Sequence, residues 1–341
     1  MKSLTRTVTA VALATALAVM SGCSSSDDSS DTKGNGKLEK VTYLTSFGNF
    51  GRDAYAWVAK EKKFFEEAGF DVDIKSGQGT GGNIDLVVAG KADFTPVDLT
   101  GALLKVGSTG KTGDFVAVAA IQQRTMAAIF STEGSGISTP KDLEGKKIAD
   151  TPGSVVRLLF PTYARLAGVD ATKVDWPNGE ASGLMGMLAG GSVHGIGQFV
   201  VGKPTVEAVT KKKAVMLPYS DVMTDLYGNV LITSSKLAKE KPDMVKRFTA
   251  ALLKGLEHSL ANPAEAGEIL KKNEPTANPQ SAAAELQLMD AFVKSAGSGA
   301  QVGALDTQRI ARCIALLQGA GSIPAGLTPE KIIDFNLVPK A

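Results

Sequence analysis

Residues 41–95 constrain the fold more than any other part of the chain. Their pattern predicts strands over residues 41–46, 70–75 and 92–95, with helices over residues 53–68 and 84–89 between them. Two consecutive strand–helix–strand units form an open parallel sheet, in which the loops that follow the strands gather at one edge. Ligands bind at that edge in sheets of this kind. The sequence therefore predicts an α/β fold whose functional residues lie on these loops.

The first predicted helix, residues 53–68, has one apolar face. Apolar residues such as Val58 and Phe65 recur at the helical period, and charged residues occupy most of the opposite face. Gly69 follows and is placed to end the helix in a left-handed turn. The next strand, residues 70–75, alternates apolar and polar residues, so we expect one buried and one exposed face.

Several segments carry a resemblance to a known family. Residues 55–72 read YAWVAKEKKFFEEAGFDV, residues 88–94 read VAGKADF, and residues 138–148 read STPKDLEGKKI. Together with residues 183–195 and 241–248, they resemble in order and spacing the solute-binding proteins of ABC importers. The branch is the NMT1/THI5-like one, with binders of alkanesulfonates, nitrate, thiamine precursors and aromatic acids. The resemblance implies a periplasmic-binding-protein-like fold of type II, with two α/β lobes and a ligand cleft between them.

The length agrees with two lobes. If a signal of 22 residues is removed from the 341, the 319 residues that remain are more than a single core usually fills. We expect a signal peptide over residues 1–22, a lipidated tether over 23–38, a first lobe over 39–130 and 232–341, and a second lobe over 131–231. The helical pattern after residue 235 predicts four helices that wrap the first lobe and carry no chemistry, over residues 244–260, 263–272, 282–296 and 307–317.

The N-terminus predicts export and anchoring. A positively charged start precedes an apolar core over residues 8–19, which is typical of a secretory signal and too short for a membrane span. Small residues precede Cys23 as in a bacterial lipobox, although Met20 stands where Leu is more usual. We therefore expect Cys23 to be acylated and to hold an extracytoplasmic protein on the cell membrane, with plain secretion as the alternative. Residues 24–36 are mostly Ser, Asp and Gly, a composition typical of a tether.

The sequence gives little support to catalysis. Residues 77–82 read GQGTGG, which fits the glycine pattern of dinucleotide-binding loops, but the turn follows the second strand and precedes a short helix. We interpret it as a turn in which backbone N–H groups approach a ligand. The two histidines, His194 and His258, have no partner at metal-ligand spacing, so no metal or cofactor is predicted. Cys313 lies in an apolar helical pattern and is predicted to be a buried thiol.

The candidate ligand site is built from loop tips. The loops after the strands supply polar, aromatic and glycine residues that can orient a small solute, stack on it and exclude water. These residues are Phe47, Gly48, Asn49, Phe50, Arg52, Gly79, Thr80, Asp98, Gln123, Arg124, Ser154, Arg157 and Gln198.

Three of these residues are arginines and favour an anionic ligand. Arg52, Arg124 and Arg157 fall in segments expected at the cleft, and arginine matches carboxylates and sulfonates with paired donors. A surface charge is the alternative for each of them. If Arg52 binds the ligand, Arg52→Ala weakens an anionic solute by a few kcal/mol at most.

The sequence hence predicts a monomeric lipoprotein that captures a small organic solute and passes it to an ABC permease. The resemblance implies the permease partner, and the net charge of +2 gives no indication of nucleic-acid binding. Within the same class, a neutral pyrimidine or thiamine-precursor-like heterocycle remains open as the ligand. From other classes, a pyrimidine-synthase-like enzyme or a sensory domain on the same scaffold remains open.

Overall fold

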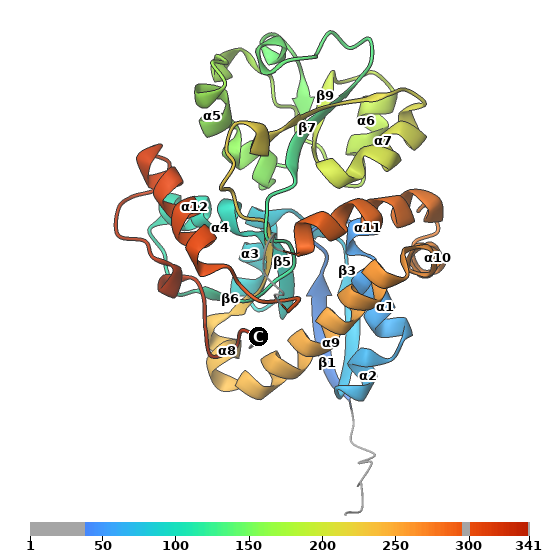
Figure 1. The fold of residues 1–341 in the computed structure, drawn as a ribbon, viewed down its shortest axis with the longest axis vertical. Helices are drawn as coiled ribbons and strands as arrows, with labels where there is room; N and C mark the ends of the chain where they lie inside the picture. Colours follow the sequence, from blue (N-terminus) through green and yellow to red (C-terminus); the bar gives the residue numbers. More distant parts are fainter. Residues whose placement is uncertain (1–37, 295–300, 340–341) are drawn as a thin grey trace, which may run out of the picture. The chain divides into compact units, whose positions relative to one another are not determined.

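Two separate sheets organise the part of the chain that the structure describes (Figure 1). The structure is a computed structural model that describes residues 38–294 and 301–339. The predicted signal peptide, Cys23 and residues 24–36 lie outside the described residues. Within the described residues, no helix is long and apolar enough to cross a membrane.

The first lobe is built on a five-stranded sheet of order β3-β1-β5-β11-β6. β1 is parallel to β3 and β5, as predicted, whereas β11 returns antiparallel between β5 and β6. These strands are β1 (Glu39–Leu44), β3 (Phe70–Lys75), β5 (Phe94–Asp98), β6 (Phe115–Ala120) and β11 (Asn229–Ser234). The alternation predicted for β3 is confirmed, because Phe70 and Val72 are buried while Asp71 and Asp73 are exposed.

The helix predicted over residues 53–68 is in fact broken into shorter pieces. A 3-10 turn, η1 (Gly51–Asp53), leads into α1 (Tyr55–Glu61), and α2 (Phe64–Glu67) follows after Lys63 adopts a left-handed conformation with φ of 63°. The break keeps Phe65 in the core, where its ring stacks on Phe248 at 5.1 Å. Gly69 ends this region with φ of 90°, so the predicted left-handed turn is confirmed.

The next helix begins earlier than predicted. α3 spans Thr80–Val88, so the glycines at positions 81 and 82 form its first turn rather than a loop before it. A two-stranded ribbon of β2 (Phe47–Gly48) and β4 (Gly77–Gln78) fixes the loops that enter this region. α4 (Leu99–Thr109) starts directly after β5. Both helices therefore point their N-termini toward the edge at which the parallel strands end.

The second lobe has a four-stranded sheet of order β10-β7-β9-β8. Its strands are β7 (Ala127–Thr132), β8 (Ile148–Ala149), β9 (Gly195–Phe199) and β10 (Ala214–Pro218), and its helices are α5 (Val155–Leu166), α6 (Leu184–Ala189) and α7 (Lys203–Thr210). The expected lobe boundary at residue 130 is wrong for residues 127–130, because they belong to β7, which pairs with β9 and β10. A buried apolar strand fits either sheet, so its hydrophobicity does not show which one it joins.

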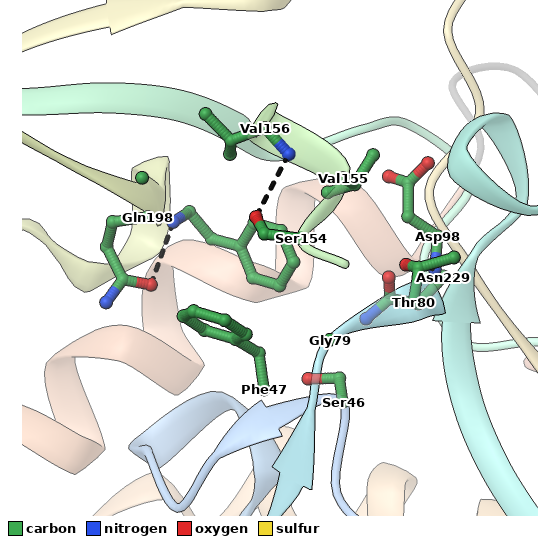
Figure 2. A pocket seen from close by; sticks show the side chains of 12 residues that line it. Ser46, Phe47, Gly79, Thr80, Asp98, Ser154, Val155, Val156, Gln198 and Asn229 are labelled. Atoms are coloured by element: carbon green, nitrogen blue, oxygen red, sulfur yellow. Dashed lines mark hydrogen bonds between the residues drawn. The ribbon is translucent and has the colours of Figure 1, made fainter. Parts of the chain in front are cut away.

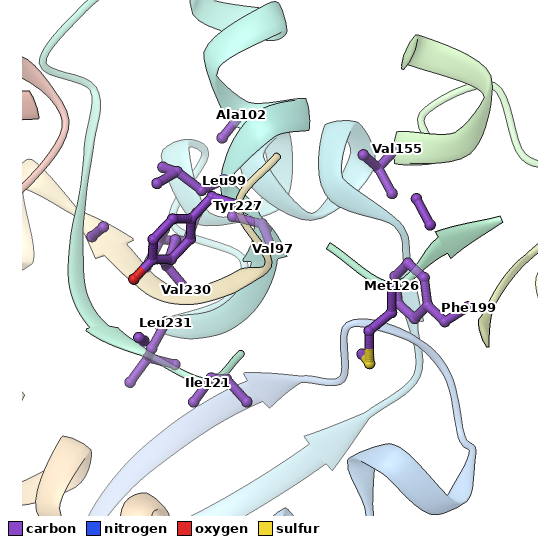
Figure 3. Packing of buried hydrophobic residues seen from close by; sticks show 14 of the residues in the cluster. Val97, Leu99, Ala102, Ile121, Met126, Val155, Phe199, Tyr227, Val230 and Leu231 are labelled. Carbon is purple, nitrogen blue, oxygen red and sulfur yellow. The ribbon is translucent and has the colours of Figure 1, made fainter. Parts of the chain in front are cut away.

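The crossings between the sheets consequently lie between β6 and β7 and between β10 and β11. Short 3-10 turns accompany these connections and other loops; they are η2 (Pro140–Leu143), η3 (Ala171–Lys173), η4 (Val200–Gly202), η5 (Tyr219–Asp221) and η6 (Pro329–Lys331). One cluster of buried apolar residues continues from the first lobe through Met126 to Val155 and Phe199 of the second (Figure 3). The lobes therefore share part of their core.

The predicted C-terminal helices are confirmed, apart from residues 295 and 296, which lie outside the described part. After α8 (Ser235–Glu240) come α9 (Pro242–Ala261), α10 (Pro263–Asn273), α11 (Pro279–Val293) and α12 (Thr307–Gly319). α9 packs on α1, and α11 also contacts α7 and so reaches the second lobe. Cys313 of α12 is a free thiol with no exposed surface, as predicted.

Candidate functional site

A small cavity lies where the two lobes meet. From the first lobe it is lined by residues that follow β1, begin α3, end β5 and begin β11; from the second lobe it is lined by the start of α5 and the end of β9. These residues are Ser46, Phe47, Gly79, Thr80, Asp98, Ser154, Val155, Val156, Gly197, Gln198, Phe199 and Asn229. Figure 2 shows Phe47 and Gln198 on one side of this space and Thr80, Asp98 and Asn229 on the other.

The lobes are in direct contact around the cavity. Gly81 N donates a hydrogen bond to Gly153 O at 2.8 Å, and Thr151 Oγ1 donates to Gln78 O at 3.1 Å. A Cβ at Gly153 would lie 2.9 Å from Gly82 N, so only glycine allows this approach. The remaining space open to the centre of a water molecule is about 10 Å³, enough for about one water. An organic solute therefore requires the lobes to separate before it enters.

Asp98 is the one ionisable side chain among the cavity-lining residues. It caps α4, where its Oδ1 accepts from Gly101 N at 3.1 Å, and its Oδ2 accepts from Thr125 Oγ1 at 3.0 Å. Burial raises the pKa of Asp98 to about 7, although these hydrogen bonds favour the ionised form. Asp98 also pairs with Asn229 across β5 and β11, which places the two side chains at the same edge.

The second lobe contributes a helix start and an amide. Ser154 caps α5, its Oγ accepting from Val156 N at 3.2 Å, and Gln198 Oε1 accepts from Phe199 N at 2.8 Å (Figure 2). Both side chains are buried, at 4% and 2% exposure. The amide nitrogen of Gln198 and the hydroxyl of Ser154 are therefore the polar groups that this lobe can offer to a solute.

A second carboxyl group, Asp150, lies immediately behind this wall. A Cβ at Gly197 would lie 2.0 Å from Asp150 Oδ2, so the carboxyl group occupies the place of a side chain at position 197. Burial raises the pKa of Asp150 to about 7. Its Oδ1 accepts from Thr151 N at 2.8 Å, whereas Oδ2 has no hydrogen-bond partner among the described residues.

The structure does not bring Arg52 into the cavity as predicted. Its side chain is 1% exposed, and its guanidinium lies between the rings of Phe50 and Phe199, at 4.5 and 4.7 Å from their centroids. It donates to Phe47 O at 3.1 Å, and it forms ion pairs with Asp53 at 3.7 Å and Glu285 at 3.9 Å. Burial raises the pKa of both carboxyl groups, and Arg52 opposes this. Arg52 therefore has a structural role behind the cavity wall, where its guanidinium pairs with two buried carboxyl groups.

The other two arginines do not enter the cavity, although Arg157 is half-buried and its charge lowers the pKa of Asp150 behind the wall. Arg124 is exposed and donates to Ala291 O at 2.7 Å, and Arg157 donates to Asn178 Oδ1 at 2.6 Å. Neither is among the cavity-lining residues. Both occur in segments whose backbone runs close to the cavity, and sequence alone does not show that their side chains turn away from it.

The remaining predicted residues divide into two groups. Those that line the cavity are Phe47, Gly79, Thr80, Asp98, Ser154 and Gln198. Gly48, Asn49, Phe50 and Gln123 do not line it: Asn49 and Phe50 face a neighbouring groove beside α10 and α11, and Gln123 Nε2 donates to Ala304 O at 2.6 Å.

Sequence reasoning missed several residues of the site. Ser46, Phe199 and Val155 are direct neighbours of predicted residues and could have been found by extending each loop by one position. Asn229 lies on the returning strand β11, and no local pattern connects it to Asp98. Glu285 of α11 joins Arg52 with Thr205 of α7, although its helix was expected to carry no chemistry.

Metal binding finds no support in this region. Across residues 38–294 and 301–339, no group of three or more His, Cys, Asp or Glu side chains is placed to hold a metal ion. The described site offers hydroxyl, amide, aromatic and carboxyl groups, which can hold and orient a small solute by hydrogen bonds and stacking.

Comparison with solved structures shows the fold. The alkanesulfonate-binding protein SsuA from Xanthomonas axonopodis pv. citri, bound to MOPS, superposes with a TM-score of 0.65 at 16% identity, covering 85% of this chain and 96% of that chain. The periplasmic nitrate-binding protein NrtA from Synechocystis PCC 6803 gives a TM-score of 0.65 at 13% identity, covering 88% and 87%. A Candida albicans gene product described as having the generic periplasmic binding protein fold gives 0.63 at 16% identity, covering 85% and 92%. The predicted periplasmic-binding-protein-like α/β fold is thus confirmed.

Comparison of sequences identifies the family. None of the curated proteins compared with the chain matches it. A family model described as NMT1/THI5 like matches residues 54–266, more than half of the 341 residues. The match spans strands and helices of both lobes, including the residues from Gly79 to Asn229 that line the cavity. The chain therefore belongs to the NMT1/THI5-like family.

Proposed function

We propose that this protein captures a small organic solute outside the cytoplasm and delivers it to an ABC permease. The observation that carries the proposal is the cavity at the lobe junction, which buried polar groups from both lobes line. Closure of two lobes over such a site removes a solute from water and gives a permease a distinct shape to recognise. Solved structures with this fold that are named for alkanesulfonate and nitrate binding support the same role.

The residues that line the cavity do not favour an anionic ligand. An anion was expected because of three arginines, and none of the cavity-lining residues is Arg, Lys or His. The proposal that the ligand is a small organic solute does not depend on the arginines. A neutral pyrimidine or thiamine-precursor-like heterocycle fits a site with amide, hydroxyl and aromatic groups as well as an anion does.

Native mass spectrometry and thermal unfolding of the purified full chain test solute capture. The solutes to compare are aromatic carboxylates, alkanesulfonates, nitrate, bicarbonate, pyrimidines and flavins. A solute at about a hundred times its Kd adds roughly 2.7 kcal/mol to the free energy of unfolding. Gln198→Ala should weaken binding, whereas Gln318→Ala in α12, away from the cavity, should not.

Delivery is tested by uptake of the solute that binds. A strain that lacks the gene should lose uptake, and the full chain should restore it. Normal uptake without the gene would contradict delivery. Conversion of the solute to another compound by the purified protein would favour an enzyme, and loss of a transcriptional response with uptake intact would favour a sensory domain.

Membrane anchoring through Cys23 is a separate part of the proposal. The lipobox-like residues before Cys23 support acylation, which would hold a monomer at the membrane surface beside its permease. A fatty-acid analogue should label the protein in cells and should not label Cys23→Ala. Cys313→Ala is the matched control, since this thiol is buried, and it should label like the parent. Equal labelling of both variants would contradict the assignment.

A further inference from the structure

The walls of the cavity and the layer directly behind them contain more carboxyl groups than cations. Asp98 lines the cavity, Asp150 lies against Gly197, and Asp53 binds the lining residue Ser46 through hydrogen bonds of 3.0 and 2.7 Å. Glu285 lies on the far side of Arg52, and Arg157 is near enough to Asp150 to lower the pKa of that carboxyl group. These four carboxyl groups thus face two cations, fewer than full pairing of buried charges needs.

At each helix start beside the cavity, one backbone donor that an anion could use is already occupied. Three helices point their N-termini at the cavity, and an N-terminus attracts anions through its free N–H groups. In α4, Gly101 N donates to Asp98; in α5, Val156 N donates to Ser154. In α3, Gly81 N donates to Gly153 O of the opposite lobe. The closed lobes therefore leave these donors to oxygen atoms of the chain itself.

Arg52 is not free to serve an anion instead. The rings of Phe50 and Phe199 enclose its guanidinium, and one of its nitrogens donates to Phe47 O. Moving it toward a solute would leave Asp53 and Glu285 as unpaired buried carboxylates, which costs several kcal/mol. The side chains that remain at the cavity are neutral amides and hydroxyls, which can donate or accept, the carboxyl group of Asp98, and the rings of Phe47 and Phe199, which attract cations.

On the basis of the proposed function, we infer that the solute is a small cation whose charge is carried by N–H donors, such as an amine, amidine or guanidine, and that Asp98 accepts its hydrogen bond. Asp98 faces the cavity beside Asn229 and Thr80 (Figure 2). Asp150, whose Oδ2 is unpartnered among the described residues, lies on the opposite lobe behind Gly197; when ionised it adds negative potential, which Arg157 partly offsets. A cation placed between them supplies the charge that the walls lack.

The surroundings of Asp98 make binding depend on pH. α3 and β11 present Thr80 and Asn229, the loop before β7 presents Thr125, and α5 presents Val155, none of which titrates. From α12 the thiol of Cys313 faces this region, and its pKa is raised to about 11 by burial, so it stays neutral. Because burial raises the pKa of Asp98 to about 7, a cation should bind more weakly below pH 7 and should release a proton on binding.

The test uses pairs of probes with the same shape and opposite charge. Guanidinium is compared with nitrate, and benzamidine with benzoate and neutral benzamide, by isothermal titration calorimetry on the full chain at pH 6 and 8. We expect the cationic member of a pair to bind and its anionic and neutral counterparts to bind at least tenfold more weakly. Titration in two buffers of different ionisation enthalpy should show proton release at pH 6.

The matched variants are Asp98→Asn and Asp306→Asn. Both aspartates cap a helix of the first lobe, with cap hydrogen bonds of 3.1 and 2.9 Å, but only Asp98 lines the cavity. Asp98→Asn should reduce cation affinity at least tenfold and abolish proton release, and Asp306→Asn should change neither. Circular dichroism of both variants verifies that they fold.

The alternative outcomes separate the two proposals. Preferential binding of nitrate or benzoate, or a co-purifying solute without a cationic nitrogen, would overturn the charge inference and leave solute capture intact. Absence of binding by every probe, together with no co-purifying solute, would overturn both. Unchanged cation affinity in Asp98→Asn would remove this residue from the site.

Discussion

At the scale of single residues, Arg52 shows how position changes the role of a charge. Among residues 38–294 and 301–339 it is the largest fully buried side chain, and two carboxyl groups flank it. Its neighbours Asp53 and Glu285 come from η1 and α11, so one guanidinium joins two segments that are distant in sequence. Arg52 therefore contributes to the stability of the junction rather than to direct recognition of the solute.

Replacement of Arg52 by alanine should strongly destabilise the protein. Arg52→Ala leaves two buried carboxyl groups without a counter-ion, and we expect the free energy of unfolding at pH 7 to fall by about 3 to 5 kcal/mol. Urea unfolding measures this change. Arg124→Ala, at an exposed position, should change it by less than about 0.5 kcal/mol. Equal effects of the two substitutions would contradict the structural role of Arg52.

Asp150 should make stability depend on pH. Burial raises its pKa from 3.8 to about 7, so the folded protein binds this proton more tightly than the unfolded chain does. Its contribution to stability is greatest at low pH and is lost as pH rises from about 4 to about 7, by about 4 kcal/mol at most.

Urea unfolding between pH 5 and pH 8 should accordingly show a shallower decline in Asp150→Asn than in the parent. Asp170→Asn provides the control, since hydrogen bonds from Thr172 lower the pKa of this exposed carboxyl group and its titration lies below that range. An unchanged slope in Asp150→Asn would mean that Asp150 is ionised throughout.

At the scale of elements, the ring of Phe248 is the centre of an aromatic cluster between α9 and the first-lobe sheet. The ring of Phe248 stacks on Phe94 at 4.1 Å and on Phe65 at 5.1 Å, and it contacts Phe70 edge-on at 5.8 Å. It therefore contacts β3 and β5, the two neighbours of β1 in the sheet, and also α2. This cluster is one of the buried contacts by which the C-terminal segment packs on the first lobe.

Phe248→Ala should lower the free energy of unfolding by about 3 to 5 kcal/mol, because it leaves a large void among these rings. The loss should appear in urea unfolding, and solute affinity of the folded protein should stay within about twofold, because Phe248 does not line the cavity. Phe335→Ala, at a ring that is 41% exposed, should have a small effect. A large loss of affinity in folded Phe248→Ala would show that α9 acts on the site.

At the scale of the whole described unit, glycines set how closely the lobes approach. Gly81 and Gly153 bring two backbones within hydrogen-bond distance, and the first turn of α3 meets the loop before α5. The contact lies beside the cavity, because Gly79 and Ser154 both line it. Closure and the size of the cavity are therefore coupled.

Gly153→Ala should favour an open arrangement. Its new Cβ would lie 2.9 Å from Gly82 N, a clash that separation of the lobes relieves. We expect a larger radius of gyration by small-angle X-ray scattering and weaker solute binding, with little change in unfolding. Gly186→Ala is the control, since nothing lies within 4 Å of its new Cβ, and it should leave scattering and affinity unchanged. Equal scattering of the two variants would contradict the coupling.

The sequence predicted which backbone segments form the site, but it did not predict where their long side chains point. Backbone positions followed from the strand pattern, so residues such as Gly79 and Ser154 were placed at the lobe junction. The directions of long side chains did not follow, and the three arginines turned into the interior or onto the surface. A guanidinium several bonds from its Cα can point either way, and local sequence does not determine which.

Local periodicity was enough to predict the class of the fold. Periodicity predicted parallel strands β1, β3 and β5, the helices between them and the helices after residue 235, because burial of one face imposes a local pattern. Tertiary structure alone decided that β7 joins the second sheet, that Asn229 lies beside Asp98, and that Glu285 meets Arg52. These contacts join segments far apart in the chain, and nothing in either segment encodes its partner. The charge of the cavity wall depends on which distant side chains these contacts bring together, so it can be read only from the folded protein.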